Sequence, residues 1–400
     1  MKLSISSIIY TIIYSSILAW WTKKLLGDFF HIDVANIVFT QTINKELEYT
    51  ISAAKQFLEN YQYGFKNNTI DVYSPDSPKP VKAAFVILVR NEELYKMKAS
   101  MQGIEDRFNR KFNYPYVFLN DVPFTEAFKV NMRAMTKAKI EFGLIDKKHW
   151  GYPEHINQTY AAECRSRMAA EKVLYGSSES YRHMCRFNSG FFFEHPLVAD
   201  LDYYWRIEPE VTYSCDIDYD PFMFMQENDI KYGFTIALYE YYNTIPTLWD
   251  SVKNFAKQYT HLIPKNNSLT WISHNNGTNY SGCHFWSNFE IGSLQFLRSK
   301  EYRTFFQFLD NAGGFFYERW GDAPVHSIAA AMFLAPQQIH WFEDIGYKHA
   351  PWENCPQNPD RLLKCSCDPA TSAIHSYYAK CTVDWNSNVT SISPEIFASS

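Results

Sequence analysis

The feature that most constrains this fold is an uninterrupted apolar run, Ala83–Val89, followed at once by a helical pattern. A continuous run of this length is typical of a strand that is buried on both faces of a sheet. Between Leu94 and Phe112, apolar residues recur every three or four positions, which predicts an amphipathic helix. Tyr114–Asn120 and Ile140–Ile145 then predict two more strands. The strand–helix–strand order predicts an α/β fold with a mainly parallel central sheet.

Three later apolar runs, Phe187–Phe193, Tyr203–Glu208 and Tyr232–Tyr239, predict further strands. Among the 15 glycines there is neither a G-x-G-x-x-G motif nor a Walker A motif, which disfavours a dehydrogenase and a P-loop NTPase. A nucleotide-sugar enzyme needs neither loop, because a divalent metal can neutralise the diphosphate. The formal net charge is −5, so no basic excess suggests a nucleic-acid partner.

The N-terminal segment predicts a link to a membrane. Leu3–Trp21 carries no charged residue and is just long enough for a spanning helix, so residues 1–24 are predicted to be a cytoplasmic tail and a signal anchor. A cleaved signal peptide is the alternative, since Ala19 fits a cleavage site. Residues 25–80 are predicted to be a lumenal stem, residues 81–383 the folded domain, and residues 384–400 a flexible tail.

Cysteines and glycosylation sequons also favour the lumen. The chain has 8 cysteines, all C-terminal to the predicted membrane segment. An even number of cysteines in such a chain favours disulfides, although the sequence does not determine which cysteines pair. The alternative is a metal site at the C-terminal cysteines, which lack the C-x₂-C spacing of zinc sites. The C-terminal cysteines are Cys355, Cys365, Cys367 and Cys381, and the N-x-Ser/Thr sequons begin at Asn67, Asn157, Asn266, Asn276, Asn279 and Asn388.

The strand predicted over Tyr203–Glu208 runs directly into two carboxylates, Glu208 and Glu210. Ligands bind at strand ends in open α/β sheets, and hard oxygen ligands there suit Mg²⁺ or Mn²⁺ carrying a diphosphate. Pro209 between them ends the sheet pairing. By spacing alone, a solvated strand end is the favoured interpretation of the two acids.

A second acidic cluster lies at Asp216, Asp218 and Asp220 and satisfies a D-x-D pattern twice. It also resembles a calcium loop, with Glu227 at the twelfth position. The sixth position is Pro221, where the turn of an EF-hand needs glycine. Calcium binding is therefore disfavoured, while direct metal binding by the aspartates remains an alternative to the strand-end site.

Three further polar residues lie among aromatic side chains: Glu290 in CHFWSNFE, Asp322 in GGFFYERWGD and His349 in HWFEDIGYKH. A carboxylate buried in such surroundings should have a shifted pKa. Acids and histidines alone also fit a metal hydrolase, so their spacing does not determine the reaction.

These segments closely resemble the fungal Golgi α-1,2-mannosyltransferase family, glycosyltransferase family 15. The resemblance extends in order over residues 83–383. It implies a GT-A-type nucleotide-sugar-binding fold over 81–383, a type II Golgi membrane protein, GDP-mannose as donor, a mannose-terminated glycan of a glycoprotein as acceptor, and Mn²⁺ as cofactor. The matching stretches are AAFVILVRN, IEDRFNRKFNYPYVFLNDVPF, SYRHMCRFNSGFFF, YYWRIEPEV, CDIDYDPF, YGFTIALYE, CHFWSNFEIGSL, AGGFFYERWGDAPVHSIA and HWFEDIGYKHAP.

The resemblance implies roles for individual residues. Glu208 and His349 match the metal ligands, which displaces the aspartates of the D-x-D cluster from that role. Glu290 matches the carboxylate that acts as a nucleophile or stabilises the cation, and Tyr181 and Asp322 match active-site residues. Residues assigned to the donor nucleotide are Arg90, Asn120, Asp121 and Arg206.

The implied reaction is retaining α-1,2-mannosyl transfer to a mannose of an N- or O-linked glycan. The transition state should resemble an oxocarbenium ion, so Glu290 is useful both as an attacking group and as a charge stabiliser. Transfer of mannosylphosphate or formation of another linkage is one alternative, and a non-catalytic mannose-binding protein is another. Two departures from the family pattern, Glu194 and Trp352, concern acceptor preference.

Overall fold

The computed structural model describes residues 81–398. The predicted signal anchor and stem, residues 1–80, lie outside this described part. No helix within 81–398 combines the length and apolar character needed to cross a bilayer.

A seven-stranded sheet forms the centre of the described domain, in the order β12-β6-β11-β4-β1-β2-β3. Pairings β1–β2, β2–β3, β1–β4 and β6–β12 are parallel, whereas β11 is antiparallel to both of its neighbours. The sheet is therefore mixed and mainly parallel, as predicted. Its strands are β1 (Ala83–Leu88), β2 (Tyr116–Asn120), β3 (Ile140–Leu144), β4 (Tyr203–Arg206), β6 (Tyr232–Phe234), β11 (Glu290–Ser293) and β12 (Ile339–Trp341).

Three smaller sheets complete the strand pairing. Antiparallel β7 (Ala237–Tyr239) and β10 (Cys283–Phe285) form one, and β8 (Ser273–His274) pairs with β9 (Asn279–Tyr280). The third contains β5 (Thr212–Tyr213), β13 (Tyr347–His349) and β14 (Trp352–Asn354).

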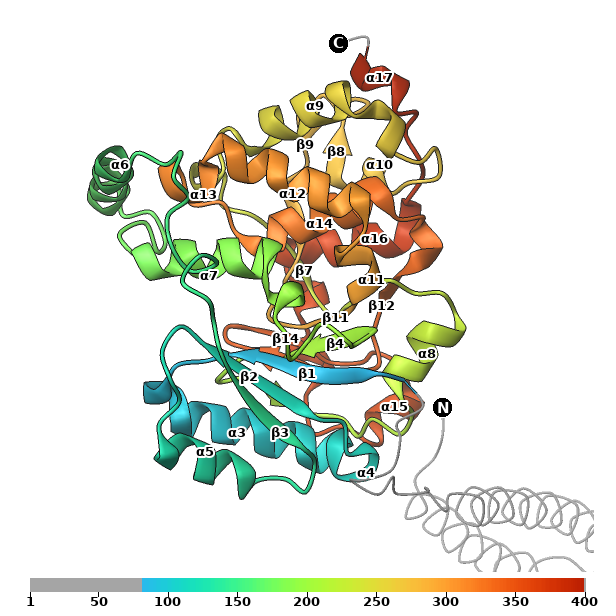
Figure 1. Cartoon of the computed structure of the whole chain (residues 1–400). Helices are drawn as coiled ribbons and strands as arrows, with labels where there is room; N and C mark the ends of the chain where they lie inside the picture. Colours follow the sequence, from blue (N-terminus) through green and yellow to red (C-terminus); the bar gives the residue numbers. More distant parts are fainter. Residues whose placement is uncertain (1–80, 399–400) are drawn as a thin grey trace, which may run out of the picture. The chain divides into compact units, whose positions relative to one another are not determined.

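Both faces of the central sheet are buried, which explains the continuous apolar run of β1. Phe85 and Ile87 belong to one hydrophobic core, and Ala84 and Val86 to the other. Figure 1 shows α3 and α5 on one side of β1–β3, and α7, α12 and α14 on the opposite side. The longer helices are α3 (Leu94–Ile104), α5 (Glu126–Arg133), α6 (Gln158–Ala170), α7 (Glu179–Gly190), α8 (Pro221–Glu227), α9 (Leu248–Gln258), α12 (Lys300–Ala312), α14 (Asp322–Phe333) and α16 (Lys380–Asn388).

The helix predicted between Leu94 and Phe112 is present but not uniform. It begins as α3, passes through a π-helical turn at Glu105–Asn109 and ends as α4 (Arg110–Phe112). The buried carboxylate of Glu105 accepts hydrogen bonds from Tyr116 Oη at 2.6 Å and from Asn109 Nδ2 at 3.0 Å. These side-chain bonds tie the wide turn to β2 and explain the local departure from α-helical geometry. Shorter helices are α10 (Leu269–Ile272), α11 (Leu294–Leu297), α13 (Gly314–Tyr317), α15 (Pro359–Leu362) and α17 (Glu395–Ala398).

Two strand predictions need correction. The run Phe187–Phe193 is not a strand: it forms the end of α7 and a short 3₁₀ turn at Phe192–Glu194. Helix α7 packs against α12 and α14, so its last turns are buried on several sides. A helix buried in this way has a continuous apolar run in its sequence, as a buried strand does. The run Tyr232–Tyr239 divides into β6 and β7, which belong to different sheets.

The C-terminal segment from residue 384 is also different from the predicted loose tail. Ile392 and Phe397 are 7% and 2% exposed, and Asn267 donates from Nδ2 to the Ile392 carbonyl at 2.8 Å. Helix α17 packs on α9. The chain is therefore docked on the domain as far as Phe397.

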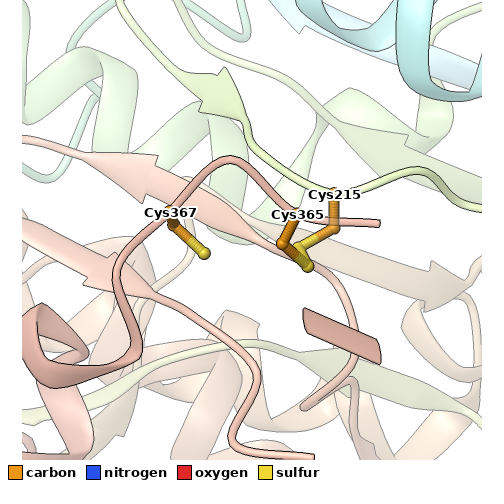
Figure 2. Close-up of side chains that lie close together, drawn as sticks. All are labelled: Cys215, Cys365 and Cys367. Atoms are coloured by element: carbon orange, nitrogen blue, oxygen red, sulfur yellow. A yellow bond between two sulfur atoms is a disulfide. The ribbon is translucent and has the colours of Figure 1, made fainter. Parts of the chain in front are cut away.

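Six of the cysteines form disulfides, as predicted: Cys215–Cys365, Cys283–Cys381 and Cys355–Cys367. Figure 2 shows Cys367 beside the Cys215–Cys365 bond, and sulfur atoms of all three cysteines lie within 4.8 Å of one another. Metal binding by cysteine requires a thiolate, whereas these three sulfurs are each bonded to another sulfur. The alternative of a C-terminal cysteine metal site is therefore excluded.

Candidate active site

The direction of the strands brings the predicted site residues to one edge of the sheet. Strands β1, β2 and β4 are parallel, so their carboxyl ends lie together, near Arg90, Asn120 and Glu208. Strand β11 runs the opposite way and therefore begins at this edge. Its first residue, Glu290, is directly paired with Arg206, the last residue of β4. Residues far apart in sequence thus meet where open α/β sheets bind ligands.

A cavity of about 320 Å³ lies at this edge, within the size range of small-molecule sites. Its walls come from the ends of β1, β2 and β4 and from α7. Six residues predicted from the sequence line it: Arg90, Asn120, Asp121, Tyr181, Arg206 and Glu208.

A smaller cavity of about 20 Å³, with room for about one water molecule, lies deeper. It shares Asn188 and Arg206 with the larger cavity and is lined by Glu290 and Tyr204. The Tyr204 hydroxyl is buried without a hydrogen-bond partner in the described part of the chain. Glu290 thus lines a small buried cavity that adjoins the larger cavity with the nucleotide candidates.

Arg206 links three acidic residues of the site. Its guanidinium forms ion pairs with Glu208 and Asp322, and its Nη1 lies 3.8 Å from Glu290 Oε1. The Arg206 side chain is 11% exposed, so these charges interact in a partly desolvated environment. Arg206 was assigned to the donor nucleotide, but its nearest charged partners within 81–398 are these carboxylates. Arg206 also lines the larger cavity, so it can hold the acids together and contact a ligand there.

Glu290 is held in a fixed orientation. It is 1% exposed, and its Oε2 accepts hydrogen bonds from Tyr232 Oη at 2.8 Å and from His326 Nδ1 at 2.9 Å. Burial by itself would raise the pKa of Glu290, but His326, Arg206 and the Tyr232 hydroxyl outweigh burial and lower it. The side chain is therefore an ionised carboxylate inside the protein.

His326 was not identified from the sequence as a site residue. Its Nε2 lies 3.0 Å from the Asn188 carbonyl oxygen, and its Nδ1 faces the Glu290 carboxylate. Both partners are acceptors only, so both ring nitrogens must carry protons. Burial favours the neutral ring, yet the adjacent Glu290 outweighs it and raises the pKa of His326. The spacing D-x-x-x-H, which places His326 one helical turn after Asp322 in α14, is the signal that would have found it.

Asp322 begins α14 and is 4% exposed. Ser287 Oγ donates to its Oδ2 at 3.0 Å, in addition to the ion pair with Arg206. Burial opposes ionisation of Asp322, but Arg206, His326 and Ser287 together lower its pKa. Its negative charge also suits the N-terminal end of a helix. Asp322 touches Arg206 rather than the larger cavity, so it acts through that arginine.

Tyr181 projects from α7 into the larger cavity. Its ring stacks on Tyr175 with centroids 4.4 Å apart, and the Arg319 guanidinium carbon lies 5.3 Å from the ring centroid. Burial raises the pKa of Tyr181, so its phenol stays protonated and can donate a hydrogen bond. Nearby, Arg90 Nη2 donates to Ser180 Oγ at 2.9 Å, which orients the guanidinium at the cavity wall.

The two candidate metal ligands lie on segments that are joined by strand pairing. Glu208 follows β4, and the chain then enters β5, which pairs with β13 so that Thr212 is opposite Lys348. His349 ends β13, and its Nδ1 is buried without a hydrogen-bond partner among residues 81–398. Glu208 uses Oε1 for Arg206, which leaves Oε2 for another partner. A carboxylate oxygen and a free imidazole nitrogen suit Mn²⁺, so these residues fit the metal.

The rival D-x-D aspartates are otherwise engaged. Asp216 pairs with Arg107 at 2.7 Å, and Asp218 with Lys111 and Lys364. Asp220 caps α8 by accepting from the backbone N–H of Phe222 at 2.9 Å. Each carboxylate of this cluster thus has a structural partner that accounts for it without a metal.

A family model described as glycolipid 2-alpha-mannosyltransferase matches residues 40–389, nearly the whole chain. The chain belongs to this family. Glycolipid 2-alpha-mannosyltransferase 1 of Candida albicans is 54% identical over 291 residues, which cover 72% of this chain and 68% of the relative. Alpha-1,2 mannosyltransferase KTR1 of Saccharomyces cerevisiae is 48% identical over 327 residues, covering 81% and 83%.

Two solved structures resemble the domain. Core-mannan synthase A of Aspergillus fumigatus, in a Mn/GDP form, has a TM-score of 0.72 at 42% identity and covers 83% of this chain and 88% of its own. The mannosyltransferase Ktr4p of S. cerevisiae, in complex with GDP, has a TM-score of 0.74 at 37% identity and covers 82% and 89%. The family and the fold together make this protein a glycosyltransferase with a GT-A-type fold.

Proposed function

We propose that this protein is a retaining α-1,2-mannosyltransferase that uses Mn²⁺ and moves mannose from GDP-mannose to a mannose hydroxyl of an N- or O-linked glycan. One observation carries the proposal. The cavity at the strand ends shares two lining residues, Arg206 and Asn188, with a smaller cavity that is lined by the buried carboxylate of Glu290. A sugar diphosphate needs this combination of a polar cavity, metal ligands and an acid at the reacting carbon.

Glu208 and His349 are the proposed metal ligands. Bound there, Mn²⁺ would neutralise the charge that develops on the GDP leaving group. A relative supports the choice of metal, since the similar A. fumigatus enzyme was solved in a Mn/GDP form. Arg90, Asn120 and Asp121 are the proposed contacts to the nucleotide, because they line the cavity at the ends of β1 and β2.

Glu290 is the proposed group at the anomeric carbon. Its Oε2 already accepts two hydrogen bonds, whereas Oε1 faces Arg206 at 3.8 Å. Oε1 is therefore the oxygen available to an oxocarbenium-like transition state, either for attack or for charge stabilisation. Tyr181 would donate to a sugar oxygen from the cavity wall. Asp322 and His326 are positioning residues that hold Arg206 and Glu290.

His326→Gln should lower kcat by roughly 10–100-fold while leaving KM for the donor little changed, because Glu290 loses a charged donor that fixes its orientation. The acid limb of the kcat–pH profile should move upward, since burial then raises the pKa of Glu290 without opposition from the imidazolium. In the parent protein kcat should also fall at alkaline pH, as His326 loses its proton. The kcat–pH profile of the variant should lack this alkaline fall. The groups facing His326 that share this titration are Glu290, Asp322, Arg206 and Tyr302.

Met332→Leu, a swap of similar volume in α14, is the matched control and should keep the parent profile. An unchanged acid limb in His326→Gln, measured on protein with the same melting temperature as the control, would contradict the positioning role.

One experiment distinguishes the proposed function from two alternatives, which are transfer of mannosylphosphate and sugar binding without catalysis. The test is to incubate the protein with GDP-mannose, Mn²⁺ and methyl α-mannoside and to identify the nucleotide released. Hexosyl transfer releases GDP, transfer of mannosylphosphate releases GMP, and a binding protein releases neither. We expect GDP; GMP, or no nucleotide, would refute the proposal.

The N-terminal segment is the basis for a proposed position of the enzyme in the cell. We place residues 1–24 as a signal anchor of the Golgi membrane, residues 25–80 as a lumenal stem, and the catalytic domain in the lumen. The three disulfides support an oxidising compartment.

A further inference from the structure

A row of aromatic side chains lies on the surface next to the proposed site. Trp352, Tyr378, Tyr377 and Tyr239, here called the aromatic row, are connected ring to ring by centroid distances of 5.7, 6.2 and 5.8 Å. Tyr377 and Tyr378 are 75% and 60% exposed. Large rings seldom gather on a surface without a partner, because their burial is favourable. The aromatic row is therefore a candidate binding surface.

The inner end of the aromatic row meets the proposed metal ligand. Trp352 in β14 is directly opposite His349 in β13, and directly opposed residues of an antiparallel pair project from the same face. On its other side, the His349 ring contacts Trp286 with centroids 5.1 Å apart. Trp286 precedes Ser287, which donates to Asp322. The inner end of the aromatic row, Trp352, is thus the direct strand neighbour of the proposed metal ligand His349.

The outer end of the row has a rigid base. Tyr377 and Tyr378 belong to a 3₁₀ turn, Tyr377–Ala379, which packs against β7. The Tyr378 N–H donates to Ser376 Oγ at 3.2 Å. Two residues beyond the turn, Cys381 is disulfide-bonded to Cys283, the β10 residue that pairs with Tyr239 of β7. The backbone that carries the two exposed rings is therefore anchored to the domain, so it does not have to be ordered when a ligand binds.

The chemistry of the row fits a neutral sugar chain. A pyranose ring has an apolar face of C–H groups that packs on an aromatic ring, and its hydroxyls bond to phenol groups at the edges. An anionic ligand or a lipid surface with anionic headgroups would be matched by free cations around the rings. Here Lys380, the cation next to the turn, is paired with Asp384 at 3.3 Å.

We propose that the aromatic row is a remote acceptor subsite that binds sugar units of an extended mannose chain while its terminal mannose occupies the active site. This inference rests on the proposed function and deepens it, because it names the acceptor class as a chain of several sugars. Binding energy from the row would lower KM for long acceptors and leave transfer to a single mannose unaffected.

The test compares Tyr377→Ala/Tyr378→Ala with the parent full chain, using methyl α-mannoside and a linear α-mannopentaoside as acceptors. The double alanine variant should raise KM for the mannopentaoside about tenfold, the loss expected for two ring contacts, and should change KM for methyl α-mannoside less than twofold. Tyr377→Phe/Tyr378→Phe keeps both rings, so this variant should retain most of the parent's lower KM for the mannopentaoside relative to methyl α-mannoside. Tyr95→Ala in α3 removes an equally exposed ring, 78% accessible, and should have no effect on either acceptor.

Equal KM values of the alanine and parent proteins for the mannopentaoside would overturn the inference. An equal rise for both acceptors would also overturn it, since that result indicates a damaged active site. Calorimetric titration with the mannopentaoside without donor keeps the test independent of catalysis. If the parent transfers no mannose to either acceptor, the proposed function fails; ring-dependent binding in the titration would then still support the subsite, and its absence would refute it.

Discussion

Glu290→Gln is expected to lower kcat for mannosyl transfer by about 10³-fold, with little change in KM for GDP-mannose. Glutamine has the same shape and can still accept from Tyr232 through its carbonyl oxygen. What it lacks is the negative charge that opposes the developing oxocarbenium ion. Because the side chain is 1% exposed, water cannot replace that charge. Steady-state release of GDP measures the effect.

A suitable control removes another buried carboxylate. Glu105 is 3% exposed and hydrogen-bonded to Tyr116, but it belongs to the π-helical turn after α3. Glu105→Gln should keep kcat within severalfold of the parent. Full activity of Glu290→Gln, or an equal loss in both variants, would remove Glu290 from the reaction centre.

Glu208→Ala should abolish the response of activity to Mn²⁺ and lower kcat by about 10³-fold at saturating donor, since metal stabilisation of the leaving group contributes several kcal/mol. The sequence offers a rival ligand for direct comparison. Asp218 satisfies the D-x-D pattern, but the structure pairs it with Lys111 and Lys364. Asp218→Ala should therefore leave the Mn²⁺ concentration for half-maximal activity unchanged.

Titration of activity with Mn²⁺ in the two variants distinguishes the sites. A parent-like Mn²⁺ curve for Glu208→Ala, or a loss of the Mn²⁺ response in Asp218→Ala, would contradict the assignment of Glu208 and favour the aspartates. Tryptophan fluorescence on Mn²⁺ addition gives a reading that does not depend on turnover, because Trp286 contacts the second proposed ligand, His349.

Local sequence patterns predicted those central strands well whose two faces are both buried. Ala83–Val89 reads as a buried strand because both faces of β1 contact hydrophobic cores. The same reasoning made Phe187–Phe193 a strand, although it belongs mostly to α7, because a helix that is buried on several sides also gives a continuous apolar run. The pattern of apolar residues indicates which positions are buried. Whether a buried run is a strand or a helix depends on the elements that pack against it in the folded domain.

Individual residues of the candidate site were named from family resemblance, whereas their interactions required the fold. The pairing of Glu290 with Arg206 depends on β11 running against β4, which no local pattern encodes. The same holds for His326, whose two acceptor partners come from β11 and α7. Disulfide pairing was equally inaccessible, since Cys215 and Cys365 are 150 residues apart.

The anomeric configuration and linkage of the product test the central claim most directly. The parent protein, GDP-α-mannose, Mn²⁺ and methyl α-mannoside are incubated, and the disaccharide is analysed by NMR. Retaining transfer with Glu290 at the reacting carbon predicts an α-linked mannose on O2 of the acceptor. A β-linked product, or an α-linkage to another hydroxyl, would contradict a retaining α-1,2-mannosyltransferase.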